Sequence, residues 1–226
     1  MKKGTITEKS HLTRSKILQA ALDLFRENGF VNTTMRNIAE KGEVALGSAY
    51  YYFKTKDDIV LAYYAETQQE ANEHNEKIVA ESKDFKKRFN ALLTFKFVQM
   101  KDDRQLVGVL AKSAAAPDNQ LSPFSPDTKD IRLAAIKLIE DVMSGSNIQV
   151  AKEIKPHLAR ALWLYQMGLI FYWIHDKSPD QKKTFQFKDL SLDILIKLMQ
   201  LSSLPLMSPI NRPVIELLKN FEQCTD

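Results

Sequence analysis

The chain has 226 residues, of which 44% are hydrophobic and 27% charged, so it is long enough and apolar enough to bury a sizeable globular core. It holds only 7 Gly and 8 Pro, too few turn-forming residues for a sandwich or barrel, and the composition favours helices. The formal net charge is +4, but residues 1–56 carry ten Lys/Arg against five Asp/Glu, whereas the remainder carries 22 against 23. A basic first quarter on a near-neutral body is typical of a polyanion-binding head.

The cysteine content and hydropathy predict a cytoplasmic protein with no membrane segment. Cys224 is the only cysteine, which excludes an intramolecular disulfide, and we interpret it as an incidental thiol. The first residues contain no apolar core of a signal peptide. The longest apolar stretch, residues 161–174, is interrupted by Gln166 and is too short to span a bilayer.

The first quarter of the chain predicts a flexible basic arm over residues 1–11 and then four helices. An apolar stripe at helical spacing follows Thr13, a candidate N-cap, and stops at Asn28-Gly29. Thr33 or Thr34 can cap a short second helix that ends near Lys41-Gly42. A third short helix covers residues 45–53, and a fourth, capped by Thr55, runs from Lys56 to about His74.

The rest of the chain shows helical periodicity between clear Pro, Gly, Ser and Asn breaks, with no alternating strand pattern and no internal repeat. Pro213 suits the first turn of the last helix. The sequence therefore predicts an all-α protein of about nine to ten helices. The later helices are expected over residues 83–100, 103–116, 127–143, 156–175, 188–204 and 212–223.

Residues 34–53 have the organisation of a helix-turn-helix, in which the second helix lies in the DNA major groove. That second helix carries small residues, Gly47 and Ser48, which allow a close approach to DNA, followed by three consecutive tyrosines. Three successive positions of a helix cannot all face inward, so we expect one or two tyrosines to be exposed. We expect Ala49 and Phe53 to pack inward and Val44 to seal the turn.

Residues 12–60 resemble the DNA-binding domain of the TetR family of bacterial regulators. The resemblance covers about fifty residues at fixed spacing, and the rest of the chain matches the family only in helicity and length. It implies an N-terminal three-helix helix-turn-helix DNA-binding domain over residues 12–60, and a helical ligand-sensing and dimerisation domain over 61–226. The matching stretches are ILQAALDLFRENGF at 17–30, TTMRNIAE at 33–40 and GSAYYYFKTKDDI at 47–59.

The resemblance also implies which residues bind DNA. Thr34 and Arg36 would contact the backbone and the groove edge, and Lys56 would hold a phosphate. The residues expected in or beside the groove are Gly47, Ser48, Tyr50 and Tyr51.

The chain departs from the family pattern at two places in this motif. Glu43 stands where the family usually has the turn glycine, with Gly42 one residue earlier. Ala45 and Leu46 replace a Ser or Thr cap and a polar or basic neighbour at the start of the recognition helix. Both departures bear on how the bases are read.

The implied second domain would form a homodimer, bind a small-molecule effector, and use the fourth helix as a lever to release a palindromic operator. Aromatic and soft side chains are candidate pocket residues, although each could equally be ordinary core. They are Phe89, Phe97, Met100, Leu106, Phe124, Trp163, Met167 and Phe171. Two stretches that are apolar nearly all round suggest a dimer interface at Leu162, Leu169, Trp173, Leu190, Ile194 and Leu198.

Other functions find less support in the residues. No nucleophile with a base, no phosphate loop and no metal-ligand spacing occurs, so we expect no enzyme, metal or cofactor. A repressor is the favoured reading. The alternatives are a DNA-binding regulator of the same fold that has no small-molecule ligand and acts constitutively, as an activator or through a protein partner, and a tyrosine-rich patch that binds a protein.

Overall fold

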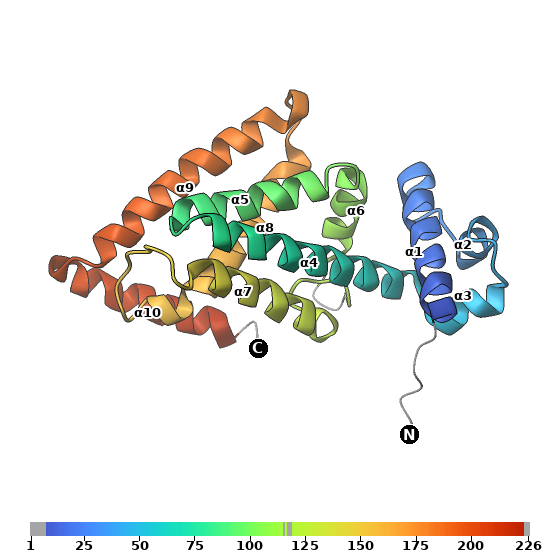
Figure 1. The fold of residues 1–226 in the computed structure, drawn as a ribbon, viewed down its shortest axis with the longest axis horizontal. Coiled ribbons are helices and arrows are strands. Elements are labelled where there is room, and N and C mark those ends of the chain that lie inside the picture. Colours follow the sequence, from blue (N-terminus) through green and yellow to red (C-terminus); the bar gives the residue numbers. More distant parts are fainter. Residues whose placement is uncertain (1–7, 115, 117–118, 224–226) are drawn as a thin grey trace, which may run out of the picture.

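The computed structural model describes residues 8–114, 116 and 119–223, and within them it contains ten α-helices and no strand. The prediction of an all-α fold with nine to ten helices is confirmed (Figure 1). Four short 3₁₀ turns precede α7, α8, α9 and α10. The helices are α1 (Glu8–Asn28), α2 (Met35–Lys41), α3 (Leu46–Tyr52), α4 (Lys56–Glu81), α5 (Phe85–Gln99), α6 (Arg104–Ala114), α7 (Lys129–Met143), α8 (Leu158–His175), α9 (Lys182–Ser202) and α10 (Ser208–Gln223).

Two helices of the N-terminal region extend further than predicted. Helix α1 begins at Glu8, so Thr13 is not its N-cap; the Thr13 hydroxyl donates to the carbonyl of Lys9 inside the helix, at 2.9 Å. Residues 8–11 of the predicted arm are therefore helical, and residues 1–7 lie outside the described part. Helix α4 continues past His74 to Glu81 because its polar residues, with no Gly or Pro among them, keep good helical propensity.

Two helix starts in the second half were also predicted wrongly. Helix α9 begins at Lys182, six residues early, directly after Asp180 and Gln181 adopt left-handed backbone angles. Helix α10 begins at Ser208, so Pro213 lies inside the helix and not in its first turn. Pro209, at the second position, is the proline that occupies the first turn.

Helices α1, α2 and α3 and the start of α4 form one end of the molecule, which we call the head (Figure 1). Its core includes Ile17, Ile38, Ala49 and Ile59, each fully buried. Three side chains from outside the head complete this core: Leu106 and Leu110 of α6 and Leu121 of the following loop. They can do so because α6 contacts α1.

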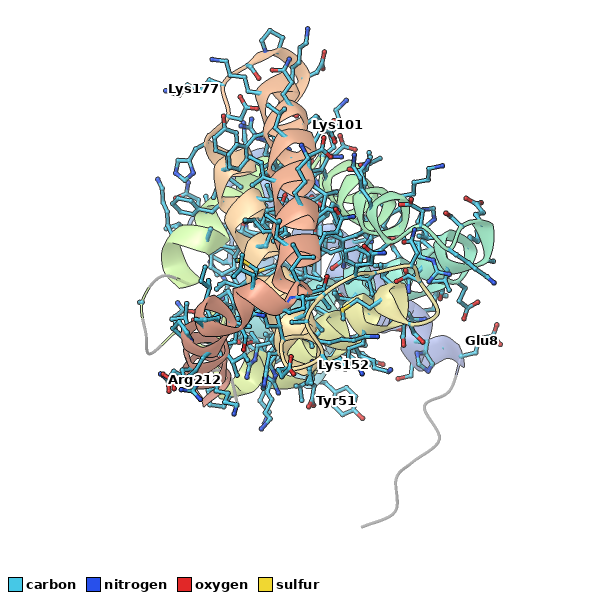
Figure 2. All side chains as sticks on the ribbon, turned by 90° about the vertical axis from the view of Figure 1, so that its left-hand side faces the viewer. Glu8, Tyr51, Lys101, Lys152, Lys177 and Arg212 are labelled. Atoms are coloured by element: carbon cyan, nitrogen blue, oxygen red, sulfur yellow. The ribbon has the colours of Figure 1, made fainter. Side chains whose placement is uncertain are left out.

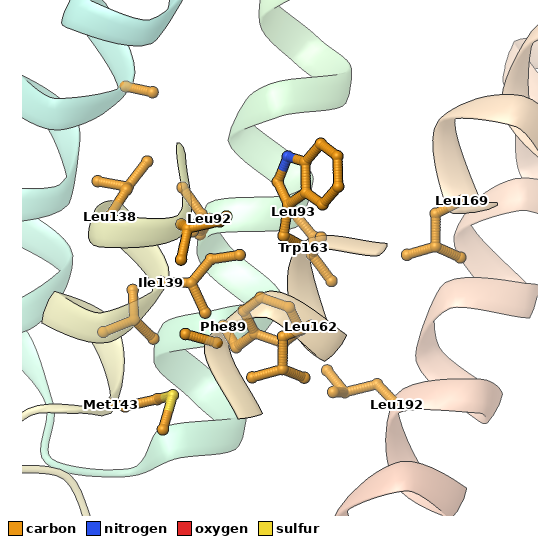
Figure 3. Close-up of a cluster of buried hydrophobic side chains, with 14 of the residues drawn as sticks. Phe89, Leu92, Leu93, Leu138, Ile139, Met143, Leu162, Trp163, Leu169 and Leu192 are labelled. Atoms are coloured by element: carbon orange, nitrogen blue, oxygen red, sulfur yellow. The ribbon is translucent and has the colours of Figure 1, made fainter. Parts of the chain in front are cut away.

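The second domain has its own core between α4, α5, α7 and α8 (Figure 3). Phe89, Leu92, Ile139 and Leu162 meet at its centre with at most 1% exposure. Helix α9 packs against α5 and α8 from outside. Helix α4 belongs to both regions, because its first turns lie in the head and its later turns contact α5 and α7.

Among the residues that the structure describes, no single helix is long and apolar enough to cross a membrane. The segments Pro179–Ser202 and Pro205–Asn220 meet that requirement only as a pair, and they are bent by 96° at their junction.

Candidate nucleic-acid interface

The start of α2 is fixed by a capping box. Thr34 adopts an extended conformation, its hydroxyl accepts a hydrogen bond from the Asn37 amide at 3.2 Å, and the Asn37 side chain accepts from the Thr34 amide at 3.0 Å. The prediction that Thr33 or Thr34 caps this helix is confirmed. Since the Thr34 hydroxyl is engaged in the cap, Arg36, one residue inside the helix and exposed, is the freer group at this end of α2.

The recognition helix α3 presents two of its three tyrosines to solvent. Tyr50 is 49% exposed and Tyr51 is 81% exposed, whereas Tyr52 is half-buried with its hydroxyl 3.0 Å from that of Ser10. Ala49 and Phe53 pack inward, as predicted. Gly47 is exposed, and a Cβ built on it would meet no atom within 4 Å. The exposed side of α3 is therefore formed by a gap at Gly47 beside the Tyr51 ring.

The geometry of the turn between α2 and α3 bears on why its glycine stands at position 42 and not at position 43. A Cβ at Gly42 would lie 3.1 Å from the Ile38 carbonyl oxygen of α2 itself, a tight contact, and 3.5 Å from the Ala20 Cβ of α1, an ordinary one, so the end of α2 favours glycine there. The left-handed residue of the turn is the next one, Glu43, with φ of 52°. A left-handed conformation at a residue with a side chain is strained by about 1–2 kcal/mol. Val44 then packs against the head core, as predicted.

Lys56 has contacts that the sequence did not reveal. Its Nζ donates to the Phe30 carbonyl at 2.5 Å and lies 3.4 Å from the Val31 carbonyl and 4.5 Å from the centre of the Phe30 ring. Burial lowers the pKa of Lys56. An ammonium group has three N–H donors, so these two carbonyls leave one donor for a phosphate. The amino group thus ties the loop after α1 to the start of α4, whose cap is the Thr55–Asp58 box.

A polar hollow beside α3 contains residues that the sequence analysis missed. Its volume is about 390 Å³, and it is lined by the recognition helix and the first two turns of α1. The spacing of Lys9, Ser10 and Thr13 along one helical face would have indicated them if α1 had been extended to Glu8. The lining residues are Lys9, Ser10, Thr13, Gly47, Ser48, Tyr51 and Tyr52.

A buried carboxylate connects the head to the second domain. Asp103, just before α6, is 5% exposed and accepts hydrogen bonds from Arg26 Nε of α1 at 2.6 Å and from the Tyr63 hydroxyl of α4 at 2.8 Å. Burial together with the Asp103 charge raises the pKa of Tyr63 far above its ordinary value, so the phenol remains a donor. The adjacent Arg104 donates to the Trp173 carbonyl at 3.0 Å, at the end of α8. Residues 103 and 104 therefore link the head, α6 and α8.

The predicted pocket residues do not surround one described hollow. Leu106 packs in the head core, apart from the other candidates, and Phe171 is 63% exposed on α8. Phe124 is 46% exposed, and its ring lies 5.7 Å from that of Trp163. The remaining candidates are buried or half-buried within the second domain: Phe89, Phe97, Met100, Trp163 and Met167.

The predicted dimer residues divide into two groups. Leu162, Leu169 and Trp173 are each 1% exposed because they pack in the protomer's own core, and the structure removes them from the predicted interface. Leu190, Ile194 and Leu198 are 66%, 59% and 57% exposed along one side of α9. Figure 2 looks onto this end of the molecule, where α9 lies in front beside α8.

Within the described ranges, no group of three or more His, Cys, Asp or Glu side chains has the arrangement of a metal site. Cys224 lies outside those ranges. The exposed aromatic rings, hydroxyls and cations on and beside α3 suit contacts to a nucleic acid.

Comparisons with known proteins match both regions. Residues 17–63 match the family model described as "Bacterial regulatory proteins, tetR family", and residues 88–216 match "Tetracyclin repressor-like, C-terminal domain". The Fatty acid metabolism regulator protein of Bacillus subtilis is 29% identical over 91 residues, which are 40% of this chain and 47% of that protein. The match thus spans about half the length of this relative.

Solved structures share the fold over most of the chain. A TetR transcriptional regulator from Nitrosomonas europaea superposes with a TM-score of 0.64 at 15% identity, covering 80% of this chain and 96% of that one. FadR from Bacillus subtilis, in complex with stearoyl-CoA, superposes with a TM-score of 0.58 at 18% identity, covering 84% and 98%. At these identities the likeness concerns the fold alone.

Proposed function

The chain belongs to the TetR family of bacterial transcriptional regulators, and we propose that it is a homodimeric repressor that a small amphipathic ligand releases from a palindromic operator. The observation that carries the proposal is Tyr51, which is 81% exposed beside an open Gly47 on the recognition helix. The Tyr51 ring packs edge-on against the Tyr52 ring with 5.1 Å between centroids and is otherwise open to solvent next to a gap in the helix surface, which suits insertion into a DNA groove.

The proposed DNA surface comprises the exposed side of α3 and the residues that flank it. Tyr51, Gly47 and Ser48 would enter the major groove, and Tyr50 would approach a phosphate or a thymine methyl group. Thr34 and Arg36 would contact the backbone on one side, and the third N–H of Lys56 would contact a phosphate. The hollow adds Lys9 and Thr13 as backbone contacts on the other side. Phosphate contacts of this kind position the helix, and the groove contacts select the sequence.

The proposed dimer forms through the exposed apolar side of α9 and the adjoining outer side of α8. Leu190, Ile194 and Leu198 place three large exposed apolar side chains along one side of α9, and Phe171 of the neighbouring α8 is exposed as well. Apolar patches of this kind mark interaction surfaces, and a two-fold axis through the patch would pair α8 and α9 of both copies. Two heads related by that axis match two half-sites of a palindrome.

The proposed effector is a small molecule with a large apolar part, bound in the second domain. FadR of Bacillus subtilis, which shares the fold, was solved in complex with stearoyl-CoA, and this supports an amphipathic ligand here. Phe89, Phe97, Trp163 and Met167 would supply apolar walls. We propose a cytoplasmic location, where the operator DNA lies, and no catalytic activity.

One observation favours the alternative of a regulator with no small-molecule ligand. Phe89, Phe97 and Trp163 are at most 3% exposed, and the two described hollows lie elsewhere, at α3 and at the α8–α9 corner. Thermal denaturation in the presence of a metabolite library separates the two functions, because a ligand that binds only the folded state raises the melting temperature.

The experiment that tests DNA binding is selection from a pool of random duplexes, followed by an electrophoretic shift with non-specific competitor. We expect the intact protein to select a palindrome, and Tyr51→Ala to lose at least tenfold in affinity for it. Since Tyr51 is highly exposed, the variant should melt within a few degrees of the wild type. Tyr52→Phe, which removes only the hydroxyl near Ser10, is the matched control and should bind nearly as well. Selection of no common sequence would refute the proposal.

A further inference from the structure

The second domain buries two lysines that differ in how well their charges are satisfied. Lys188 of α9 is 2% exposed, and its Nζ is bonded to the side-chain oxygens of Asn90, Thr94 and Asp189. Lys96 of α5 is 8% exposed, and its Nζ donates to the Gln68 Oε1 of α4 at 3.1 Å. Gln68 is its single hydrogen-bond partner among the described residues. An ammonium group carries three donors, so Lys188 is complete and Lys96 is not.

The surroundings of Lys96 do not supply the missing acceptors. Leu92 and Leu93, one turn earlier on α5, are fully buried in the apolar core. Glu70 is the carboxylate whose charge acts on Lys96, but it is exposed and accepts instead from Gln99 Nε2 at 2.7 Å. Because burial penalises the charged form, the pKa of Lys96 falls to about 8, so the group is still mostly cationic at neutral pH.

A second unsatisfied atom lies in the same seam between α4 and α5. The buried Oε1 of Gln99 accepts no hydrogen bond from any described residue, while its Nε2 donates to the carbonyl of Thr67, the neighbour of Gln68. Buried polar atoms without partners are rare in folded proteins, and each one calls for a physical explanation. Together with the incompletely bonded Lys96, one turn earlier on α5, this atom indicates a place where another molecule supplies the partners.

We propose that Lys96 is the anchor for the anionic head group of an amphipathic ligand, held at the α4–α5 seam beside Gln68 and Gln99. The anion accepts from the free N–H groups of Lys96, and a hydroxyl of the ligand or a bound water donates to Gln99 Oε1. The apolar part of the ligand would pack against the apolar side chains next to Lys96, such as Leu92 and Leu93 one turn earlier on α5. The proposal rests on the proposed function, of which it names the ligand class.

The position of this anchor connects it to the DNA-binding head. Gln68 stands near the middle of α4, the helix that begins at Lys56 in the head and carries Tyr63 of the Asp103 junction. An anion on the free N–H groups of Lys96 places a negative charge beside the hydrogen bond that joins α5 to Gln68. The occupied and empty states therefore differ in the charge beside α4, a helix shared by both regions, and such a difference can couple the two sites.

The test is a calorimetric titration of the full chain with decanoate and with decanol, which share a tail and differ in charge. We expect the wild type to bind decanoate at least tenfold more tightly than decanol. Lys96→Met should lose that tenfold advantage and keep the affinity for decanol. Lys87→Met, which removes the same charge from an exposed position of the same helix, should behave as the wild type. Equal binding of the two probes, no binding of either, or unchanged decanoate affinity in Lys96→Met would overturn the proposal.

The melting temperature of the ligand-free variant separates an anchor from a structural lysine. Replacing an incompletely bonded buried cation by an apolar side chain of similar length should leave the melting temperature unchanged or raise it. A structural role predicts a fall. Operator binding, measured in parallel without ligand, keeps the two proposals apart: a protein that selects a palindrome but does not prefer decanoate refutes the anchor alone, and one that prefers decanoate but selects no DNA refutes the repressor alone.

Discussion

The head and the α8–α9 face of the second domain are both built from helices with many apolar residues, yet only in the head does the sequence reveal which side chains face inward. Helices α2 and α3 are short and mix polar or small residues with apolar ones, and α2 begins at the capping residue Thr34. Helix α8 is apolar on nearly every side, so Leu162 in the core and Phe171 in solvent look equivalent in the sequence. A helix that mixes polar and apolar residues thus shows in its sequence which side faces the core, whereas a uniformly apolar helix shows only that most of its surface will be buried.

The largest expected effect is on the oligomeric state and concerns the exposed side of α9. Ile194→Glu places a charge in the centre of the proposed dimer face, where an unpaired buried charge costs about 3–5 kcal/mol, so the protein should elute as a folded monomer. Light scattering coupled to size exclusion measures the mass. Gln200→Glu, at an exposed position on another side of α9, adds the same charge and should leave the dimer intact. A dimer that survives Ile194→Glu would place the interface elsewhere.

The next effect concerns the carboxylate that joins the two regions. Asp103→Asn removes the charge that pairs with Arg26 and weakens the acceptor of the Tyr63 hydroxyl, so unfolding should become easier by about 2 kcal/mol. Denaturant unfolding measures the change. Asp102→Asn alters the exposed neighbour and should change stability by less than about 0.5 kcal/mol. Equal effects of the two substitutions would show that Asp103 contributes only general charge.

A smaller effect distinguishes the two roles of Lys56. Lys56→Ala should lower operator affinity for all sequences alike and reduce the slope of log affinity against log salt by about one, because one phosphate contact is lost. Losing the bonds to the Phe30 and Val31 carbonyls should also lower stability by about 1 kcal/mol. Lys54→Ala, at an exposed site two residues earlier, controls for general charge. A stability change with an unaltered salt slope would leave Lys56 a loop anchor only.

The smallest expected effect is on stability and concerns the left-handed residue Glu43 in the turn of the head. Glu43→Gly relieves the left-handed strain at the turn and, after the added flexibility of the unfolded chain is subtracted, should stabilise the protein by up to about 1 kcal/mol. Glu40→Gly, inside α2, should instead destabilise it by about 1 kcal/mol. Thermal unfolding of both variants measures the difference. A loss of stability in Glu43→Gly would show that the glutamate side chain makes a contact that outweighs the strain.

Local signals predicted the fold class, the helix-turn-helix, a cap at Thr33 or Thr34, the cap at Thr55, and the exposure of one or two of the three consecutive tyrosines. They failed where a polar segment continues a helix, as at Glu8–Lys9 and after His74, because no residue there stops the helix. They also failed where the partner lies far away in the chain. The acceptors of Lys56 are carbonyls of the loop after α1, and Leu106 of α6 packs into the core of the head. The number of hydrogen-bond acceptors near Lys96 likewise depends on how α4 packs against α5.

The exposed side of α9 has a consequence for how the regulator responds to its own abundance. In the proposed dimer Leu190, Ile194 and Leu198 leave water, so protomer and dimer would be linked by mass action. At low copy number the amount of dimer rises with the square of the protomer concentration, and operator occupancy rises with it. A twofold change in synthesis would then give about a fourfold change in occupied operator, a steepness that needs no cooperativity between neighbouring operators.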